Sequence, residues 1–136
     1  MSGSPSGLSE LVLIVADLAR AAEFYRDVVG LALARPITDE WAWFWSGEAN
    51  ASPYFALHRG TLLFEEKSPL AAGQRFGRAH FAFRVEREDL DPCLARLRAA
   101  GIEVLGPVAL DWMNADSIYF YDPDANLVEY WTPRNS

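Results

Sequence analysis

The segment Glu10-Leu-Val-Leu-Ile-Val15 is typical of a β-strand and leads into Asp17, a residue type that commonly caps helices. Over residues 18–29 the apolar side chains follow helical spacing, and Gly30 is the kind of residue at which such a helix ends. The start of the chain therefore predicts a strand followed directly by a helix.

The same design recurs in the second half of the chain. His80-Phe-Ala-Phe-Arg-Val85 predicts a strand, and residues 89–100 predict a helix that ends at Gly101. Three strand-like runs follow each helix: 31–35 running on to 41–45, 54–58 and 61–67 in the first half, and 102–108, 117–121 and 127–132 in the second. Each half is therefore predicted to form a βαβββ module.

The chain has 136 residues, which suits a single domain. Hydrophobic residues make up 51% of the chain, enough to build a core. We expect residues 1–8, rich in serine and glycine, to be a flexible leader. Residues 9–136 are expected to form one domain from two modules, at about 9–69 and 78–133.

Composition argues against several classes of function. Acidic residues outnumber basic ones by 19 to 12, a formal charge of −7, which disfavours nucleic acid and anionic membrane surfaces as partners. The single cysteine, Cys93, cannot form an internal disulfide, and no apolar run approaches the roughly 20 residues that span a bilayer. Arginine is strongly preferred over lysine, which favours a GC-rich bacterial source. The sequence predicts a bacterial, cytoplasmic protein with a small-molecule ligand.

Three stretches resemble a known superfamily. They are Leu11-Val-Leu-Ile-Val-Ala-Asp-Leu18 with Phe24-Tyr-Arg-Asp-Val-Val-Gly30, His80-Phe-Ala-Phe83, and Ser117-Ile-Tyr-Phe-Tyr-Asp-Pro-Asp-Ala-Asn-Leu-Val-Glu129. The chain after Ser9 thus resembles the vicinal oxygen chelate superfamily, which includes glyoxalase I, bleomycin-resistance proteins, fosfomycin-resistance enzymes and extradiol dioxygenases. The resemblance implies an α+β fold, with two βαβββ modules forming a cupped eight-stranded mixed sheet, helices on the outer face and a ligand, often a metal ion, inside.

Strand parity indicates which side chains face this cup. Phe81 and Phe83 share the face that can pack under a helix, so His80 faces the cup. By the same count, Glu10 faces the cup from the first strand as the repeat partner of His80. On the last strand, Glu129 also faces the cup.

The ends of the two halves suggest a fourth cup position. Matching Ser68-Pro69 to Thr132-Pro133 places Glu65 opposite Glu129. The predicted cup positions are therefore Glu10, Glu65, His80 and Glu129, and they match the places where metal-dependent members of the superfamily carry ligands. Glyoxalase- and epimerase-type members commonly have His or Gln at the position of Glu10, and extradiol dioxygenases a second histidine, so Glu10 argues against dioxygenase activity.

Charge provides a physical reason for a metal ion. Three carboxylates converging in a partly dry cup would repel one another unless a cation neutralised them. One imidazole among oxygen ligands suits a single divalent ion such as Mn²⁺, Mg²⁺, Ni²⁺, Co²⁺ or Fe²⁺, with Zn²⁺ also considered. Such an ion could chelate two substrate oxygens while Glu129 or Glu65 acts as the catalytic base.

Simpler interpretations stay open for these residues. His80 can be a hydrogen-bonded, half-buried histidine, and Glu129 can form an ion pair with Arg84. Glu65 adjoins Glu66 and Lys67 and fits an ordinary charged edge. His58, on the opposite parity from the apolar side chains of its strand, is expected to be structural or exposed.

Aromatic residues form a second candidate feature. Trp41, Trp43 and Trp45 alternate, so their indoles share one face. This face suits packing on a partner subunit, packing on the protein's own core, or an aromatic wall for a planar or cationic ligand. The candidate substrate-binding residues are these three with Arg84, Tyr119 and Trp131.

These observations lead to competing hypotheses. The favoured one is a glyoxalase-like, divalent-metal-dependent lyase or isomerase that acts on a small oxygenated substrate. The alternative is a metal-free protein resembling bleomycin-resistance proteins, which sequesters a cationic aromatic drug. A fosfomycin-type transferase is the weaker alternative. The resemblance also implies a homodimer.

Overall fold

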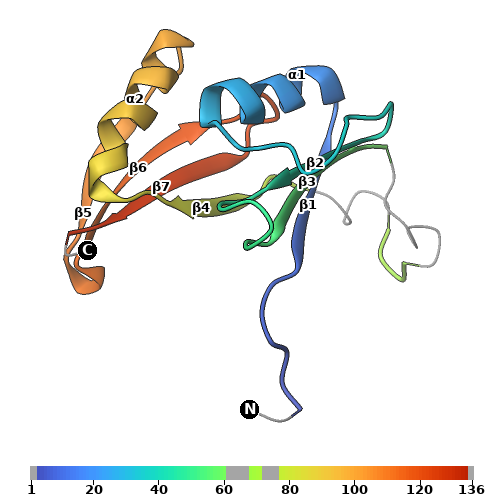
Figure 1. Ribbon diagram of the computed structural model, residues 1–136, viewed down its shortest axis with the longest axis horizontal. Coiled ribbons are helices and arrows are strands. Elements are labelled where there is room, and N and C mark those ends of the chain that lie inside the picture. The colour runs from blue at the N-terminus through green and yellow to red at the C-terminus, as the bar shows by residue number, and fades with distance from the viewer. Residues whose placement is uncertain (1–2, 61–67, 72–76, 135–136) are drawn as a thin grey trace.

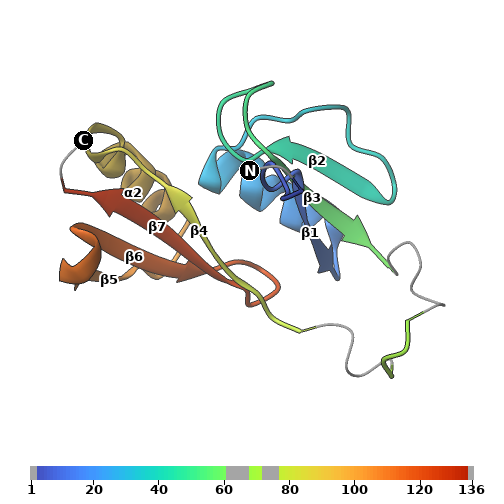
Figure 2. The same ribbon diagram turned by 90° about the horizontal axis from the view of Figure 1, so that it is seen from below.

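A computed structural model of the chain describes residues 3–60, 68–71 and 77–134. It contains a three-stranded and a four-stranded sheet, each accompanied by helical segments (Figure 1). The helices α1 and α2 lie on the same side of the two sheets, so the opposite sheet faces are free of helices in the described part of the chain; Figure 2 views the molecule from that side. None of the described helices has the length and apolar character needed to span a membrane.

The first module begins with strand β1, Glu10–Val15, which pairs in parallel with β3, Tyr54–Arg59; β3 pairs antiparallel with β2, Trp41–Trp45. The helix α1, Leu18–Glu23, continues into the π-helical segment η1, Phe24–Val29. The predicted caps are confirmed. Asp17 accepts a hydrogen bond from the Arg20 N–H at 3.1 Å, and Gly30 has a φ of 90°.

The second module repeats this arrangement with a fuller sheet. Its strands are β4, His80–Arg84; β5, Leu105–Leu110; β6, Ala115–Tyr121; and β7, Leu127–Pro133, in the spatial order β4-β7-β6-β5. The helix α2, Leu90–Ala99, follows the 3₁₀ turn η4, Arg87–Asp89, and a second 3₁₀ turn, η5, Asp111–Met113, joins β5 to β6. The predicted strand and helix order of this half is confirmed.

The first module differs from its prediction at two places. Residues 31–35 form only an isolated bridge, between Leu33 and Phe44, and residues 61–67 lie outside the described residues. The strand that pairs in parallel with β1 is β3, as β7 pairs with β4, so β3 is the counterpart of β7. The match of Ser68-Pro69 to Thr132-Pro133 is therefore wrong.

Strand pairing identifies the true repeat partner of Glu129. Val12 pairs with Ala56 in the first module, and Ala82 pairs with Glu129 in the second. Glu10 and His80 start their strands at equivalent positions, two residues before Val12 and Ala82. Ala56 therefore occupies the place in β3 that Glu129 occupies in β7, and the two cup faces are chemically different.

The core lies between the sheets and the helices, as strand parity predicts. Leu13 and Val15 of β1 are buried, and Phe81 and Phe83 of β4 pack against the same core. His80 on the alternate parity is exposed. Core-facing apolar side chains alternate with side chains on the other sheet face, because successive residues of a strand point to opposite faces.

A buried polar turn ties the modules together. Asp122 accepts hydrogen bonds from the Tyr25 hydroxyl at 2.5 Å and from the Asn126 N–H at 2.8 Å, and the Asn126 side chain accepts from the Ala79 N–H at 2.8 Å. Ala125 in this turn has a left-handed backbone, with a φ of 65°, a conformation that favours glycine. The turn thus connects η1 of the first module to the start of β4.

Candidate metal and substrate site

The parallel pair β4 and β7 brings His80 and Glu129 together on the face of the second sheet opposite α2. The His80 Nε2 atom lies 3.1 Å from Glu129 Oε1. The Glu129 side chain is only 10% exposed, whereas that of His80 is 52% exposed. The pair therefore combines a buried carboxylate with an imidazole that a ligand can reach.

The Leu127 carbonyl oxygen orients the His80 ring. Nδ1 lies 3.1 Å from this oxygen, which can only accept a hydrogen bond, so the geometry suits the tautomer with a hydrogen on Nδ1. In that tautomer Nε2 directs its lone pair toward Glu129 Oε1, 3.1 Å away. A shared proton or a metal cation can bridge these two atoms. A histidine that donates its other N–H to a backbone carbonyl is the usual arrangement in metal sites.

Ser117 holds the Glu129 carboxylate in place and was not predicted as a site residue. Its hydroxyl donates a hydrogen bond of 2.5 Å to Glu129 Oε2, and the residue is 1% exposed. The other carboxylate oxygen, Oε1, faces His80. Strand parity is the signal that could have indicated Ser117. It lies two residues before the candidate Tyr119, so the two side chains point to the same face of the sheet.

The structure does not bring Glu10 to this pair within one chain. Glu10 lies at the exposed start of β1, opposite Tyr54, in the other sheet. Among the residues that the structure describes, no three histidine, cysteine, aspartate or glutamate side chains form a group suited to a metal ion. Glu65 lies outside the described residues. The described part of one chain therefore presents a two-residue donor set, His80 and Glu129.

Three predicted substrate-binding residues flank the pair. Tyr119 pairs with Glu129 across β6 and β7, and its ring centre lies 6.1 Å from that of His80. The Arg84 guanidinium lies 5.6 Å from the ring centre of Trp131. Arg84 forms its ion pair with Glu86, at 2.7 Å, and this contact holds the pKa of the Glu86 carboxyl below its usual value. The interpretation of Glu129 as the ion-pair partner of Arg84 is thereby replaced.

The three tryptophans of β2 line the corresponding face of the first sheet. Trp41 and Trp43 stack with ring centres 5.0 Å apart, and Trp45 stacks on Tyr54 at 4.6 Å. Arg35 lies over this surface, 5.2 Å from the Trp43 ring centre. All three indoles are half-buried, so the shared face predicted from alternation is confirmed.

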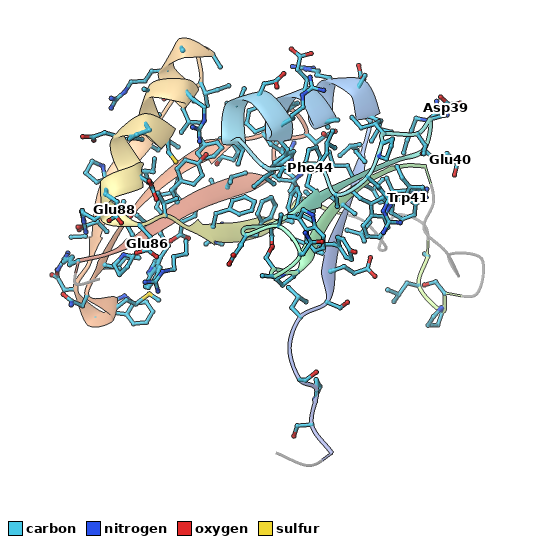
Figure 3. The ribbon with its side chains drawn as sticks, in the orientation of Figure 1. Asp39, Glu40, Trp41, Phe44, Glu86 and Glu88 are labelled. Atoms are coloured by element: carbon cyan, nitrogen blue, oxygen red, sulfur yellow. The ribbon has the colours of Figure 1, made fainter. Side chains whose placement is uncertain are left out.

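This aromatic face and the His80 site belong to different parts of one chain. Figure 3 shows Trp41 beside Asp39 and Glu40 at one end of the molecule, whereas Glu86 and Glu88 lie at the other. His58 is buried, and its ring centre lies 4.1 Å from the ring centre of Trp41. Of the two predicted alternatives, structural or exposed, the burial of His58 rules out the exposed one.

Comparison with known proteins finds one superfamily and, within it, fosfomycin-resistance proteins. The family model described as the Glyoxalase/Bleomycin resistance protein/Dioxygenase superfamily matches residues 7–130. Metallothiol transferase FosB of Bacillus licheniformis is 28% identical over 127 residues, covering 93% of this chain and 75% of that protein. Fosfomycin resistance protein FosX of Listeria monocytogenes is 30% identical over 127 residues, covering 91% and 87%.

Solved structures of similar shape include a fosfomycin resistance protein and a lactoylglutathione lyase. FosX of Listeria monocytogenes complexed with Mn(II) and sulfate has a TM-score of 0.69 and 25% identity, covering 96% of this chain and 92% of that chain. A mutant of the same protein holds Mn(II) and 1S,2S-dihydroxypropylphosphonic acid; its TM-score is 0.67, its identity 25%, and its coverage 98% and 93%. Lactoylglutathione lyase of Agrobacterium tumefaciens has a TM-score of 0.70 and 26% identity, covering 96% of both chains.

Proposed function

Since this chain belongs to the Glyoxalase/Bleomycin resistance protein/Dioxygenase superfamily, we propose that it is a divalent-metal-dependent enzyme that modifies a small phosphonate of the fosfomycin type. The observation that supports this most strongly is the His80–Glu129 pair, with its Nε2 and Oε1 atoms 3.1 Å apart. The similarity to FosB and FosX favours the fosfomycin-type transferase, our weaker alternative, over the lyase or isomerase that the sequence favoured.

The donor set of this pair fits a metal ion. Metal–ligand bonds of about 2.0–2.6 Å leave neighbouring ligand atoms roughly 3 Å apart, which is the separation of His80 Nε2 and Glu129 Oε1. We take Mn²⁺ as the first candidate because an imidazole with oxygen ligands suits it and because FosX was solved with Mn(II). A bound divalent ion would supply Lewis acidity toward a substrate oxygen.

The hydrogen bonds of Glu129 favour a ligand role over the predicted role as a base. Oε2 receives the Ser117 proton, and Oε1 faces His80, so both oxygens have partners. Ser117 and the Leu127 carbonyl thereby hold the two donor side chains in fixed orientations. For the base we keep Glu65, the candidate from the sequence, which lies outside the described residues; a nucleophile that arrives as a thiolate needs no base.

A phosphonate carries negative charge, so its site needs a cation. Arg84 lies on the same strand face as His80, and its side chain is 57% exposed. We propose that Arg84 exchanges its contact with Glu86 for the phosphonate oxygens, because a guanidinium donates two parallel hydrogen bonds to such a group. Tyr119, beside His80, would donate a further hydrogen bond, and Trp131 would support the Arg84 guanidinium.

Glu10 would join the site only from a second copy of the chain. We therefore propose a homodimer in which the first sheet of one chain covers the His80 face of the other. The tryptophans of β2 share the Glu10 face of that sheet and would then lie at or beside the interface. This arrangement keeps Glu10 as the third metal ligand.

The proposal is tested by activity on fosfomycin. Chain purified without chelator, and supplied with Mn²⁺, is incubated with fosfomycin and either glutathione or water alone, and phosphorus NMR follows the substrate. We expect metal-dependent loss of fosfomycin, with the product identifying the nucleophile. No loss under either condition would contradict the proposal.

Two other activities have specific observations in their favour. The similarity to lactoylglutathione lyase supports the lyase or isomerase, which predicts turnover of the adduct of glutathione and methylglyoxal. The stacked, half-buried tryptophans of β2 support the metal-free drug-binding protein, which predicts saturable quenching of tryptophan fluorescence by a cationic aromatic drug. The three assays, run on one protein preparation, distinguish the fosfomycin-modifying enzyme, the lyase or isomerase, and the drug-binding protein.

A further inference from the structure

A second cavity lies between the two modules, on the helix-covered side of the sheets. Its volume is about 330 Å³, within the range of small-molecule sites. Val29 and Leu31 line it from the first module, and Phe83 lines it from β4. Cys93 and Arg96 of α2 and Tyr130 of β7 also contribute to its wall. The metal site described above uses the opposite face of the second sheet.

The Tyr130 hydroxyl is buried in this region without a hydrogen-bond partner among the described residues. Tyr130 is 2% exposed, and its oxygen is shielded from solvent. Burial raises the pKa of this hydroxyl, and the charged or ionisable groups that also act on it are Cys93 and Arg96 of the same cavity. The hydroxyl therefore keeps its proton and acts as a hydrogen-bond donor. A buried donor without an acceptor destabilises the protein.

Arg96, whose side chain is exposed, adds hydrogen-bond donors at the rim of the cavity. Its Nε and Nη2 atoms donate to the carbonyl oxygens of Val28 and Val29, at 3.4 and 3.1 Å, and Nη2 also contacts Cys93 Sγ at 3.5 Å. These contacts fix the guanidinium at the wall, and no carboxylate within the described ranges forms an ion pair with it. Its Nη1 group makes no hydrogen bond there, so it retains donors for a ligand.

The charges that line the cavity balance. Arg84 and Glu86 form a 2.7 Å ion pair, and Asp89 and Arg96 are both exposed, so solvent screens both of their charges. The cavity thus offers a buried hydroxyl donor and, at its exposed rim, guanidinium donors next to apolar walls.

We propose that this cavity binds a small carboxylic acid with a branched or ring-shaped apolar body. The carboxylate would accept hydrogen bonds from Tyr130 and Arg96, and the apolar body would contact Val29, Leu31 and Phe83. A carboxylate suits the site because it accepts several hydrogen bonds and neutralises the guanidinium. This proposal uses neither His80 nor Glu129 and does not depend on metal binding, although Arg84, which we assign to the phosphonate, also lines the cavity.

The test uses the intact chain with two acids as probes, 3-methylbutanoate and benzoate, titrated by calorimetry or ligand-observed NMR. We expect saturable binding of at least one acid and none of 3-methylbutan-1-amine. Tyr130→Phe should weaken acid binding about threefold to tenfold, the range expected for one hydrogen bond. Without ligand, the same variant should melt at an equal or higher temperature, because the lost hydroxyl had no partner in the described chain.

Thr132 offers a matched control on the same strand. Its hydroxyl is likewise buried without a partner among the described residues, but Thr132 lines only a neighbouring cavity of about 290 Å³, whereas Tyr130 lines both cavities. Thr132→Val should therefore leave acid binding unchanged. The proposal is overturned if neither acid binds, if Tyr130→Phe binds as well as wild type, or if a metal chelator abolishes binding, which would place the acid at the metal site.

Discussion

Tyr25 donates a 2.5 Å hydrogen bond to Asp122, which lies 97 residues away in the sequence and is 6% exposed in the fold. Burial, followed by the charge of Asp122, raises the pKa of Tyr25 well above its usual value. The tyrosine is therefore a permanent donor that joins the first module to the turn preceding β7. This contact makes the polar turn a determinant of stability.

Removing that donor should destabilise the fold. Tyr25→Phe leaves one oxygen of the buried Asp122 with fewer hydrogen bonds, and we expect a loss of about 1–3 kcal/mol in the free energy of unfolding. Urea denaturation at neutral pH measures this loss. Tyr121→Phe is the control, because Tyr121 is 53% exposed and its change should stay within about 0.5 kcal/mol. Equal losses in the two variants would contradict the stabilising role of the Tyr25–Asp122 contact.

A second prediction separates metal positioning from substrate binding. Ser117→Ala removes the hydroxyl that orients Glu129, and it should weaken Mn²⁺ binding about 10-fold to 100-fold. Tyr119→Phe should instead raise KM for the phosphonate and leave metal affinity unchanged. Calorimetry with Mn²⁺ alone gives the first readout, and steady-state kinetics the second. Unchanged metal affinity in Ser117→Ala would show that Ser117 does not position Glu129.

The sequence predicts the His80–Glu129 pair of the metal site but not the contact of Ser117 with Glu129. Alternation along a strand places His80 and Glu129 on one face, because neighbouring side chains point to opposite sides. The Ser117 contact depends on the register between β6 and β7, where Ser117 pairs with Trp131, and parity alone does not determine that register.

The match of chain ends that singled out Glu65 fails for a related reason, whereas the role of Glu65 itself, which lies outside the described residues, stays a prediction. Matching two proline-containing ends assumes that the last strand-like run of each half is equivalent. Strand pairing shows instead that β3 takes the place of β7, so Ala56 is the counterpart of Glu129. Which strand pairs with which is a long-range property, and local propensity carries little information about it.

A third prediction concerns pH and the far end of the second module. Hydrogen bonds from Arg134 and then Arg87 hold the pKa of Asp116 below its usual value, despite an opposing effect of desolvation. A lowered folded-state pKa stabilises the fold at neutral pH, and that contribution is lost as pH falls through the folded-state value. Asp116→Asn should therefore melt below wild type at pH 7, and the difference should shrink as pH falls below the usual carboxyl value of about 3.9 and through the lowered folded-state value.

Thermal melts across this pH range measure the effect, and added salt should reduce it at neutral pH because the groups are partly exposed. Asp91→Asn on the surface of α2 is the control, since no ion pair with Asp91 is formed in the described part of the chain. If the difference between Asp116→Asn and wild type grew on acidification, the ion pairs of Asp116 would not be stabilising.

A fourth prediction tests whether two chains share the metal site. Glu10→Gln and His80→Ala should each bind metal poorly as pure proteins. Unfolded together and refolded as an equal mixture, they should form mixed dimers with one intact site, restoring about a quarter of wild-type sites if pairing is random. Metal content of the refolded mixture measures this. No restoration would place Glu10 outside the site or keep the site within one chain.

The most direct test of the central claim is the metal stoichiometry of chain purified without chelator or affinity tag and equilibrated with Mn²⁺. We predict one tightly bound ion per chain in wild type, with binding lost in both His80→Ala and Glu129→Gln while circular dichroism shows the fold intact. Retention of wild-type stoichiometry and affinity by both variants would contradict the assignment of this pair as the metal site.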